Sequence, residues 1–247
     1  MGYIGAMPTA GIVIIGNEIL SGKVVDSNSP YLCRELRALG VDVMRIVTIP
    51  DEIETIAHYV REMSRSFDLV FTSGGIGPTH DDLTIDGVAA AFGRDLELSR
   101  SIEDRLTRAN GQRPSPAQLK MAMVPEGAVL LDAGDLWFPL VVVENVHIFP
   151  GVPELLHKKF QSARERFRGI PFVLKRVYVR GRESDIAPDL DALLGRFPEL
   201  MLGSYPRLGE RDFNVLLTLE SRDASYVQSA LDELLERLPP GSIFRVE

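Results

Sequence analysis

Residues 68–92 read DLVFTSGGIGPTHDDLTIDGVAAAF, an apolar run followed by a glycine-rich stretch and a second apolar segment. The run 68–73 predicts a buried strand, and residues 84–92 predict a helix. The glycines between them lie where open α/β sheets bind their ligands. Because glycine adopts positive φ readily, successive backbone N–H groups can turn toward one point beside the N-terminus of the helix. We therefore predict a strand, a turn and a helix that together bind a phosphate group.

The same alternation of strands and helices extends over residues 1–169. Further strands are expected at residues 11–16, 41–49, 140–143 and 146–149. Further helices are expected from Ser29–Pro30 to Gly40, from a capping box formed by Asp51 and Glu54, and from Pro153 to about Phe167. Residues 109–118, ANGQRPSPAQ, have the composition of a mobile loop. This order predicts an α/β domain with βαβ units, in which helices cover both faces of a mostly parallel sheet.

A second, smaller domain is expected at residues 170–247, after a linker that contains Gly169 and Pro171. Its predicted order is a strand at 173–179, a helix at 184–197, strands at 200–205 and 214–220, a helix at 224–238 and a strand at 242–246. This order is that of a split βαβ unit, a small α+β fold of its own.

Composition and charge restrict the partners of the chain. Its 247 residues carry a formal net charge of −8, which gives no general attraction to nucleic acid. No apolar run reaches the roughly 18 residues of a membrane span, and the first residues lack the pattern of a secretory signal. The single cysteine, Cys33, lies among leucines and is expected in the core. We expect a cytoplasmic protein that contacts neither membrane nor nucleic acid.

The polar residues of the glycine-rich loop favour a ligand site over a plain turn. Thr79, His80, Asp81 and Asp82 follow the glycines directly. Two adjacent carboxylates beside a phosphate are unfavourable unless they share a proton or a cation. His80 is the one histidine in a candidate site, whereas the other three show no metal-ligand spacing.

Two other loops are open to a structural or a functional interpretation. The segment after the first strand carries Asn17, Glu18, Asp26 and Asn28, and Pro150–Gly151 follows a later strand. Each could be a surface loop or part of the ligand site, and helix capping alone would explain Asp51. Residues 16–24, GNEILSGKV, are one residue too long for a P-loop and have valine after the lysine. The first βα turn also lacks a dinucleotide fingerprint.

The segments TSGGIGPTHDDLT (72–84), IVIIGNEILSGKVVDSNS (12–29) and IPDE (49–52) resemble the molybdopterin-binding, or molybdenum cofactor biosynthesis, domain family. The chain looks most like the N-terminal domains of CinA (competence/damage-inducible) proteins and of eukaryotic FAD synthase. The resemblance continues through residues 138–156 and into LGSYP (202–206), so it covers nearly the whole chain. It implies a three-layer αβα domain followed by the small α+β domain, KH-like, of CinA proteins.

The resemblance also assigns roles to particular residues. It places the glycine loop of the family on Gly74, Gly75 and Gly77 and the two functional aspartates on Asp51 and Asp82. These aspartates are the implied catalytic residues and metal ligands, for Mg, Mn or Co, and a monovalent cation such as potassium is a further implied cofactor. The remaining implied contacts to substrate are Pro78, Thr79, His80, Asp81, Asn17, Glu18, Asp26, Asn28, Pro150 and Gly151.

Two functions are compatible with this resemblance. The first is a metal-dependent pyrophosphatase that acts on ADP-ribose or FAD. The second is a module that binds or adenylates molybdopterin without cleaving it, and the sequence does not separate the two. FAD synthesis and nicotinamide mononucleotide deamidation need further domains, so neither is expected of this chain alone. Because relatives commonly self-associate, a homodimer is expected.

Overall fold

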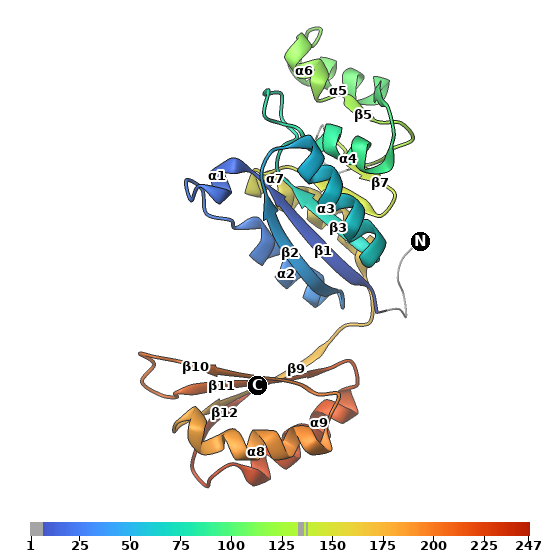
Figure 1. Ribbon diagram of the computed structural model, residues 1–247. Coiled ribbons are helices and arrows are strands. Elements are labelled where there is room, and N and C mark those ends of the chain that lie inside the picture. Colours follow the sequence, from blue (N-terminus) through green and yellow to red (C-terminus); the bar gives the residue numbers. More distant parts are fainter. Residues whose placement is uncertain (1–6, 133–135, 137) are drawn as a thin grey trace. The chain divides into compact units, whose positions relative to one another are not determined.

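A computed structural model describes residues 7–132, 136 and 138–247. The chain divides into two units, Met1–Ile170 and Pro171–Glu247, and each is described here by itself (Figure 1). Within the described residues, no helix has the length and the apolar composition needed to cross a bilayer.

The first unit is built on a six-stranded sheet. Its strands follow the order β2 (Asp42–Ile49), β1 (Thr9–Ile15), β3 (Leu69–Ser73), β8 (Val146–Phe149), β7 (Leu140–Val143) and β6 (Val129–Leu131). β1 pairs in parallel with β2 and β3, and β3 pairs in parallel with β8. β7 runs antiparallel to both of its neighbours, β8 and β6. The mostly parallel sheet predicted from the sequence is therefore confirmed.

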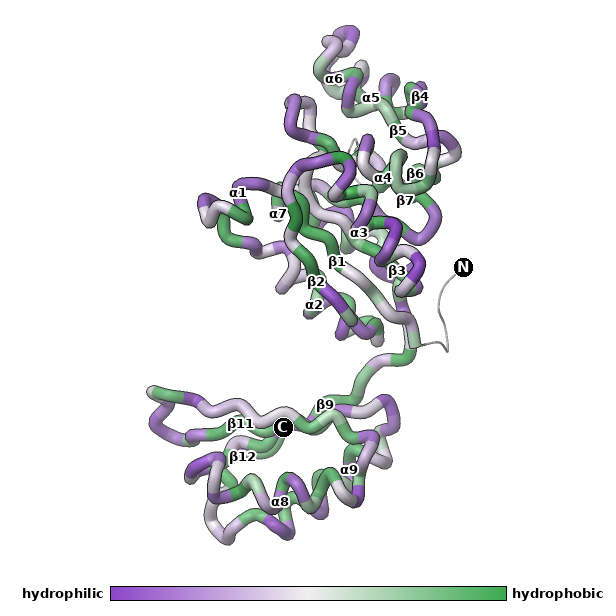
Figure 2. The backbone as a smooth tube through the Cα atoms, viewed as in Figure 1, coloured by the Kyte–Doolittle hydropathy of each residue, from purple (hydrophilic) through white to green (hydrophobic). Residues whose placement is uncertain are grey.

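Alternate side chains of the central strand enter two separate cores. Val13 and Ile15 pack with α3 (Ile53–Ser66) and α4 (Thr84–Phe92) on one face of the sheet. Ile12 and Ile14 pack on the other face with α2 (Asn28–Ala38) and α7 (Pro153–Ala163). Figure 2 shows the second half of β1 as a hydrophobic segment, which is typical of a strand buried on both faces. The unit thus has the expected three-layer αβα architecture.

Shorter elements complete the first unit. They are α1 (Asn17–Leu20), β4 (Leu96–Leu98), α5 (Arg100–Asn110), α6 (Pro116–Lys120), β5 (Met123–Pro125) and the 3-10 turn η1 (Arg164–Phe167). In the stretch 109–118, predicted as a mobile loop, residues 109–110 and 116–118 belong to helix ends and residues 111–115 connect them, so the loop is shorter than expected. Gly111 ends α5 in the left-handed conformation, and Ser115 with Gln118 forms a capping box that begins α6.

The second unit is a four-stranded antiparallel sheet covered by two helices. It comprises β9 (Val173–Val179), α8 (Glu183–Arg196), β10 (Met201–Pro206), β11 (Val215–Ser221), α9 (Ala224–Arg237) and β12 (Ile243–Val246). The strand order β10-β11-β9-β12 is that of the split βαβ arrangement. Val177 and Leu217 of the sheet pack against Leu193 and Val227 of the helices. Figure 2 shows the alternation of hydrophobic and hydrophilic segments along α8 that this one-sided packing requires.

Candidate functional site

The candidate site lies at the carboxyl ends of the parallel strands of the first unit. The chain runs from β1 to β2 on one side and then returns to β3 on the other side of β1. Such a reversal of strand order separates the loops that follow the two central strands and leaves a crevice between them. The loop after β1, the glycine-rich loop after β3 and the turn after β8 all end at this edge of the sheet.

The glycine-rich loop is fixed by close backbone contacts. Gly74 has φ 111°, and a Cβ at this position would lie 2.0 Å from the carbonyl oxygen of Ile15. Gly75 has φ 62°, and its added Cβ would lie 2.4 Å from Oγ1 of Thr84. The Thr84 hydroxyl donates to the Gly74 carbonyl at 2.8 Å, and the Thr84 N–H donates to the Gly75 carbonyl at 2.9 Å. Glycine is therefore required at both positions by conformation and by space.

Thr79 fixes the carboxylate of Asp82. Oδ2 of Asp82 accepts a hydrogen bond from the backbone N–H of Thr79 at 2.8 Å and contacts its hydroxyl. The same hydroxyl also lies 2.6 Å from Oδ1 of Asp81, where it holds the pKa of that carboxyl below its usual value. A Cβ on Gly77 would lie 2.7 Å from Oδ2 of Asp82, so the small residue leaves room for this carboxylate.

Asp51 does not cap α3, so the capping-box prediction is wrong. The N-cap position belongs to Glu52, which makes no capping side-chain bond. Instead, Oδ2 of Asp51 accepts from the backbone N–H of Asn17 at 2.8 Å, which joins the loops after β1 and β2. Burial raises the pKa of Asp51, and the charges of Glu18, Asp81 and Asp82 raise it further. Carboxylates from three loops, those after β1, β2 and β3, therefore repel one another at this site.

The donor set at this edge suits a hard divalent cation. Carboxylate oxygens are the ligands that Mg²⁺ and Mn²⁺ prefer, and a cation would relieve the repulsion that raises the pKa of Asp51. Among the residues described by the structure, no three His, Cys, Asp or Glu side chains converge on one metal position. Protein carboxylates such as Asp51 and Asp82 would thus supply part of a coordination shell, which for Mg²⁺ is usually completed by water and substrate phosphates.

Two of the predicted residues hold the loops in place. Asp26 accepts from the N–H groups of Asn28 at 2.9 Å and Ser29 at 3.0 Å, so it fixes the start of α2. The buried amide of Asn28 donates to the carbonyl of Gly151 at 2.7 Å and to Oγ of Ser73 at 2.9 Å. Asn28 thereby connects α2, the end of β3 and the turn after β8.

The turn after β8 lies against the glycine-rich loop. The carbonyl of Pro150 accepts from the Ser73 hydroxyl at 3.3 Å. An added Cβ on Gly151 would lie 3.3 Å from Cα of Gly74, so the two backbones nearly touch. Both predicted residues, Pro150 and Gly151, border the cavity described next.

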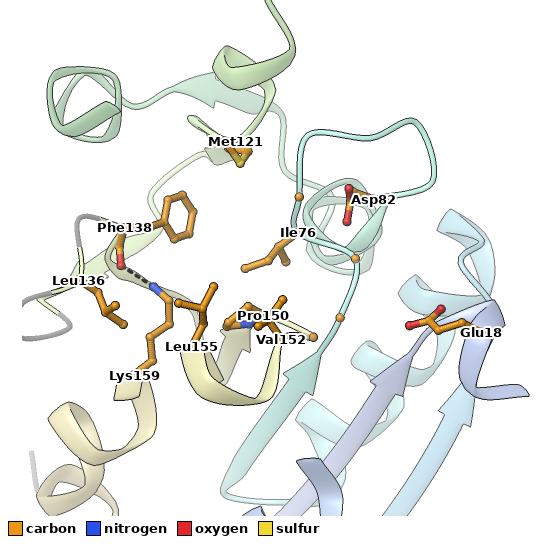
Figure 3. Close-up of a pocket in the computed structure, with 14 residues that line it drawn as sticks. Glu18, Ile76, Asp82, Met121, Leu136, Phe138, Pro150, Val152, Leu155 and Lys159 are labelled. Atoms are coloured by element: carbon orange, nitrogen blue, oxygen red, sulfur yellow. Dashed lines mark hydrogen bonds between the residues drawn. The ribbon is translucent and has the colours of Figure 1, made fainter. Parts of the chain in front are cut away.

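A cavity of about 450 Å³ opens at this point (Figure 3). The predicted residues that line it are Glu18, Gly74, Gly75, Gly77, Asp82, Pro150 and Gly151. The predicted residues that are not part of its lining are Asn17, Asp26, Asn28, Asp51, Pro78, Thr79, His80 and Asp81. Pro78 and His80 are exposed, and the His80 side chain is 98% accessible, so the structure gives it no contact with this cavity.

Half of the cavity wall was not foreseen from the sequence. It consists of Ile76, Met121, Leu136, Phe138, Val152, Leu155 and Lys159. Figure 3 shows Glu18 and Asp82 on one side, with Leu136, Phe138 and Lys159 on the other. Phe138, Val152 and Leu155 lie within residues 138–156, a segment of the family resemblance, but neither the resemblance nor the residue pattern assigned them to the site. The sequence offered one indication that Lys159 is not an ordinary surface residue, because it falls on the same helix face as Leu155, Leu156 and Phe160.

Residues 11–167, which contain the sheet and all the loops of the site, match the family described as "Probable molybdopterin binding domain". The chain belongs to the molybdopterin-binding domain family. Residues 171–247, the second unit, match the "FAD synthase, middle domain". The family match therefore covers the glycine-rich loop, both aspartates and the whole cavity wall.

Matches to two of the relatives extend over both units of this chain. A protein from Archaeoglobus fulgidus is 35% identical over 229 residues, which are 92% of this chain and 96% of the relative. A protein named "Probable FAD synthase" from Caenorhabditis briggsae is 33% identical over 262 residues, covering 94% of this chain but only 50% of the relative. Among solved structures, the protein CinA from Thermoplasma acidophilum is 30% identical with a TM-score of 0.61, covering 65% of this chain and 98% of that one. The suspected CinA-type membership is thus confirmed.

Proposed function

We propose that this chain is a metal-dependent pyrophosphatase that cleaves a nucleoside-diphosphate-linked compound of the ADP-ribose or FAD type. The observation that carries the proposal is the position of Asp82. Its carboxylate lines the cavity directly beside the glycine-rich loop, and Thr79 holds its orientation. A phosphate held at that loop would lie next to a fixed oxygen donor.

In such a reaction, different residues of the site would bind the phosphates, hold the metal ion and accept a proton. Backbone N–H groups of the glycine-rich loop and the N-terminus of α4 would bind the diphosphate. Asp82 and Asp51 would hold a divalent ion, which supplies Lewis-acid polarisation and a bound water of lowered pKa. Glu18, which faces the same cavity, would accept a proton from the attacking water. The water oxygen bonds to phosphorus, the bridging P–O bond breaks, and two phosphomonoesters leave.

The relatives support a nucleotide ligand. Two relatives from Caenorhabditis carry the name "Probable FAD synthase", and the chain matches half of the length of each. Their whole-protein activity is not part of the proposal, because the match covers only that half.

The test measures AMP release from ADP-ribose and from FAD with Mg²⁺, Mn²⁺ or Co²⁺. We expect turnover by the wild type, a loss of about a hundredfold or more in Asp82→Asn, and no loss in Asp104→Asn. Asp104 is an exposed carboxylate on α5 and serves as the matched control. Undiminished turnover in Asp82→Asn would overturn the proposal. A wild type that binds these compounds with metal and releases no AMP would also overturn it, in favour of a module that only binds its ligand.

A further inference from the structure

The antiparallel sheet of the second unit has one face covered by helices and one open face. Figure 1 shows α8 and α9 on the same side of this sheet, where Val177, Val179 and Leu217 are buried against them. Because successive side chains of a strand alternate between the two faces, Arg176 and Tyr178 of β9 belong to the other side. We call this side the open face. Across the strands, it continues from Arg176 and Tyr178 through Thr218 and Leu216 of β11 to Gly203 and Tyr205 of β10.

The segment LGSYP (202–206), part of the family resemblance, places an accessible aromatic ring on the open face. A Cβ on Gly203 would lie 2.6 Å from both Cε2 and Oη of Tyr205, so the tyrosine ring covers the backbone of this glycine. Tyr205 is nevertheless 50% exposed. Ser204 points to the other face and donates its hydroxyl to Glu183 at the start of α8. The segment thus holds an exposed ring against the sheet, and the proposed reaction gives it no role.

Two exposed arginines lie on the same face. Arg176 is directly across from Thr218 in the sheet. The guanidinium of Arg180 donates to the carbonyl of Asp212 at 3.1 Å and lies 5.1 Å from the centre of the Phe244 ring. Among the residues that the structure describes, neither arginine forms an ion pair with a carboxylate. Both guanidinium groups therefore keep a charge that an anion could neutralise.

Charge differs between the two sides of the unit. The exposed carboxylates on the helices include Asp185, Asp191, Asp232 and Glu236. By strand alternation, the charged residues of the open face are Arg176, Arg180, Arg222, Arg245, Glu220 and Glu247. Of the two carboxylates, that of Glu247 lies 3.1 Å from Arg245. The net charge of −8, which predicts no general attraction to nucleic acid, therefore does not describe this face.

We propose that the open face binds single-stranded nucleic acid, with a base stacked on Tyr205 and phosphates bound by Arg176 and Arg180. Accessible aromatic rings stack on bases, and basic groups follow the backbone, when a sheet binds a single strand. An acidic peptide would match the arginines but would bring no base to the tyrosine. A duplex keeps its bases stacked on one another. The inference concerns the second unit and does not depend on the proposed pyrophosphatase function.

Fluorescence anisotropy of labelled oligonucleotides with the full chain tests this face. The probes are a uridine and a deoxythymidine single strand of about 12 nucleotides and a duplex of the same length. We expect the wild type to bind the single strands with a Kd on the order of 10 µM at low salt. The duplex should bind about tenfold more weakly.

Variants separate the contribution of the ring from that of charge. Tyr205→Ala should weaken single-strand binding about tenfold, whereas Tyr205→Phe, which keeps the ring, should retain it. Arg176→Gln and Arg180→Gln should each reduce the slope of log affinity against log salt by about 0.7. Arg196→Gln is the matched control, because Arg196 lies on α8 and pairs with Glu233 at 3.1 Å. It should leave the salt slope unchanged, and urea unfolding shows whether each variant is folded.

Four results would overturn the inference. The first two need no variant: single strands that do not bind at low salt, or a duplex that binds as tightly as they do. The third is competition by polyglutamate as strong as that by unlabelled oligonucleotide of equal charge, which would assign the face to an acidic partner. The fourth is a folded Tyr205→Ala with wild-type affinity, or equal salt slopes for Arg176→Gln and Arg196→Gln.

Discussion

The two ends of the cavity are built differently. At the glycine-rich end, the wall is formed by backbone with positive-φ glycines and by the carboxylate of Asp82, which Thr79 holds in place. At the Lys159 end, the wall is formed by side chains from α7 and from the segments near residues 121 and 138. A wall of backbone constrains which residues can stand there, because glycine conformation and close contacts fix it, whereas a wall of side chains can change by substitution without a change in backbone conformation.

The strongest test of this difference is a glycine substitution at the backbone end. Gly74→Ala forces a Cβ to 2.0 Å from the Ile15 carbonyl at φ 111°. We expect the free energy of unfolding of the first unit to fall by about 3 kcal/mol or more. Gly22→Ala is the control, because Gly22 has φ 71° and nothing within 4 Å of the added Cβ. It should cost only about 1 kcal/mol. If urea unfolding gave the same loss of unfolding free energy for Gly74→Ala and Gly22→Ala, the close backbone contact at Gly74 would not be what requires glycine there.

At the side-chain end, the expected effect is a pH-dependent stability. Burial lowers the pKa of Lys159 from 10.5 to about 7 on folding, so between these values the unfolded chain binds more protons than the folded one. The wild type should therefore gain stability as pH rises from 7 to 10. Lys159→Met lacks this gain, so its stability relative to the wild type should fall by roughly 3 kcal/mol over that range. Urea unfolding at each pH measures it, with Lys158→Met, a change at an exposed neighbour on α7, as control. A constant difference between the two proteins would contradict the pKa shift.

The smallest expected effect concerns Asp51. Burial and the neighbouring carboxylates raise its pKa, so the ionised form destabilises the fold at pH 7. Asp51→Asn removes that charge and keeps an oxygen that can accept from the Asn17 N–H. Because Asp51 is only partly buried and solvent screens these charges, we expect a small gain, at most about 0.5 kcal/mol, without metal. Added Mg²⁺ should raise the melting temperature of the wild type more than that of the variant. Asp104→Asn should match the wild type both in unfolding free energy without metal and in the effect of Mg²⁺ on the melting temperature. A lower stability of Asp51→Asn than of the wild type would contradict charge repulsion at this site.

The sequence predicted those parts of the molecule that depend on local patterns. Apolar runs indicate burial, and they located β1 and β3 correctly. Clustered glycines indicate an unusual backbone conformation, and they located the loop between β3 and α4 correctly. Asp51 was misread as a helix cap because an aspartate before a helix has the same pattern whether it bonds its own helix or a distant N–H. The loop within residues 109–118 was predicted too long, because their polar composition obscured the capping box that begins α6. Phe138 and Lys159 could not be foreseen, because only the packing of distant segments brings them together.

The amide of Asn28 donates to Ser73 at the end of β3 and to Gly151 in the turn after β8, although Asn28 itself is not part of the cavity lining. One side chain at the start of α2 therefore links the ends of two neighbouring strands, β3 and β8. Through this amide, the position of a helix outside the cavity lining is coupled to the separation of the two strand ends that border the cavity.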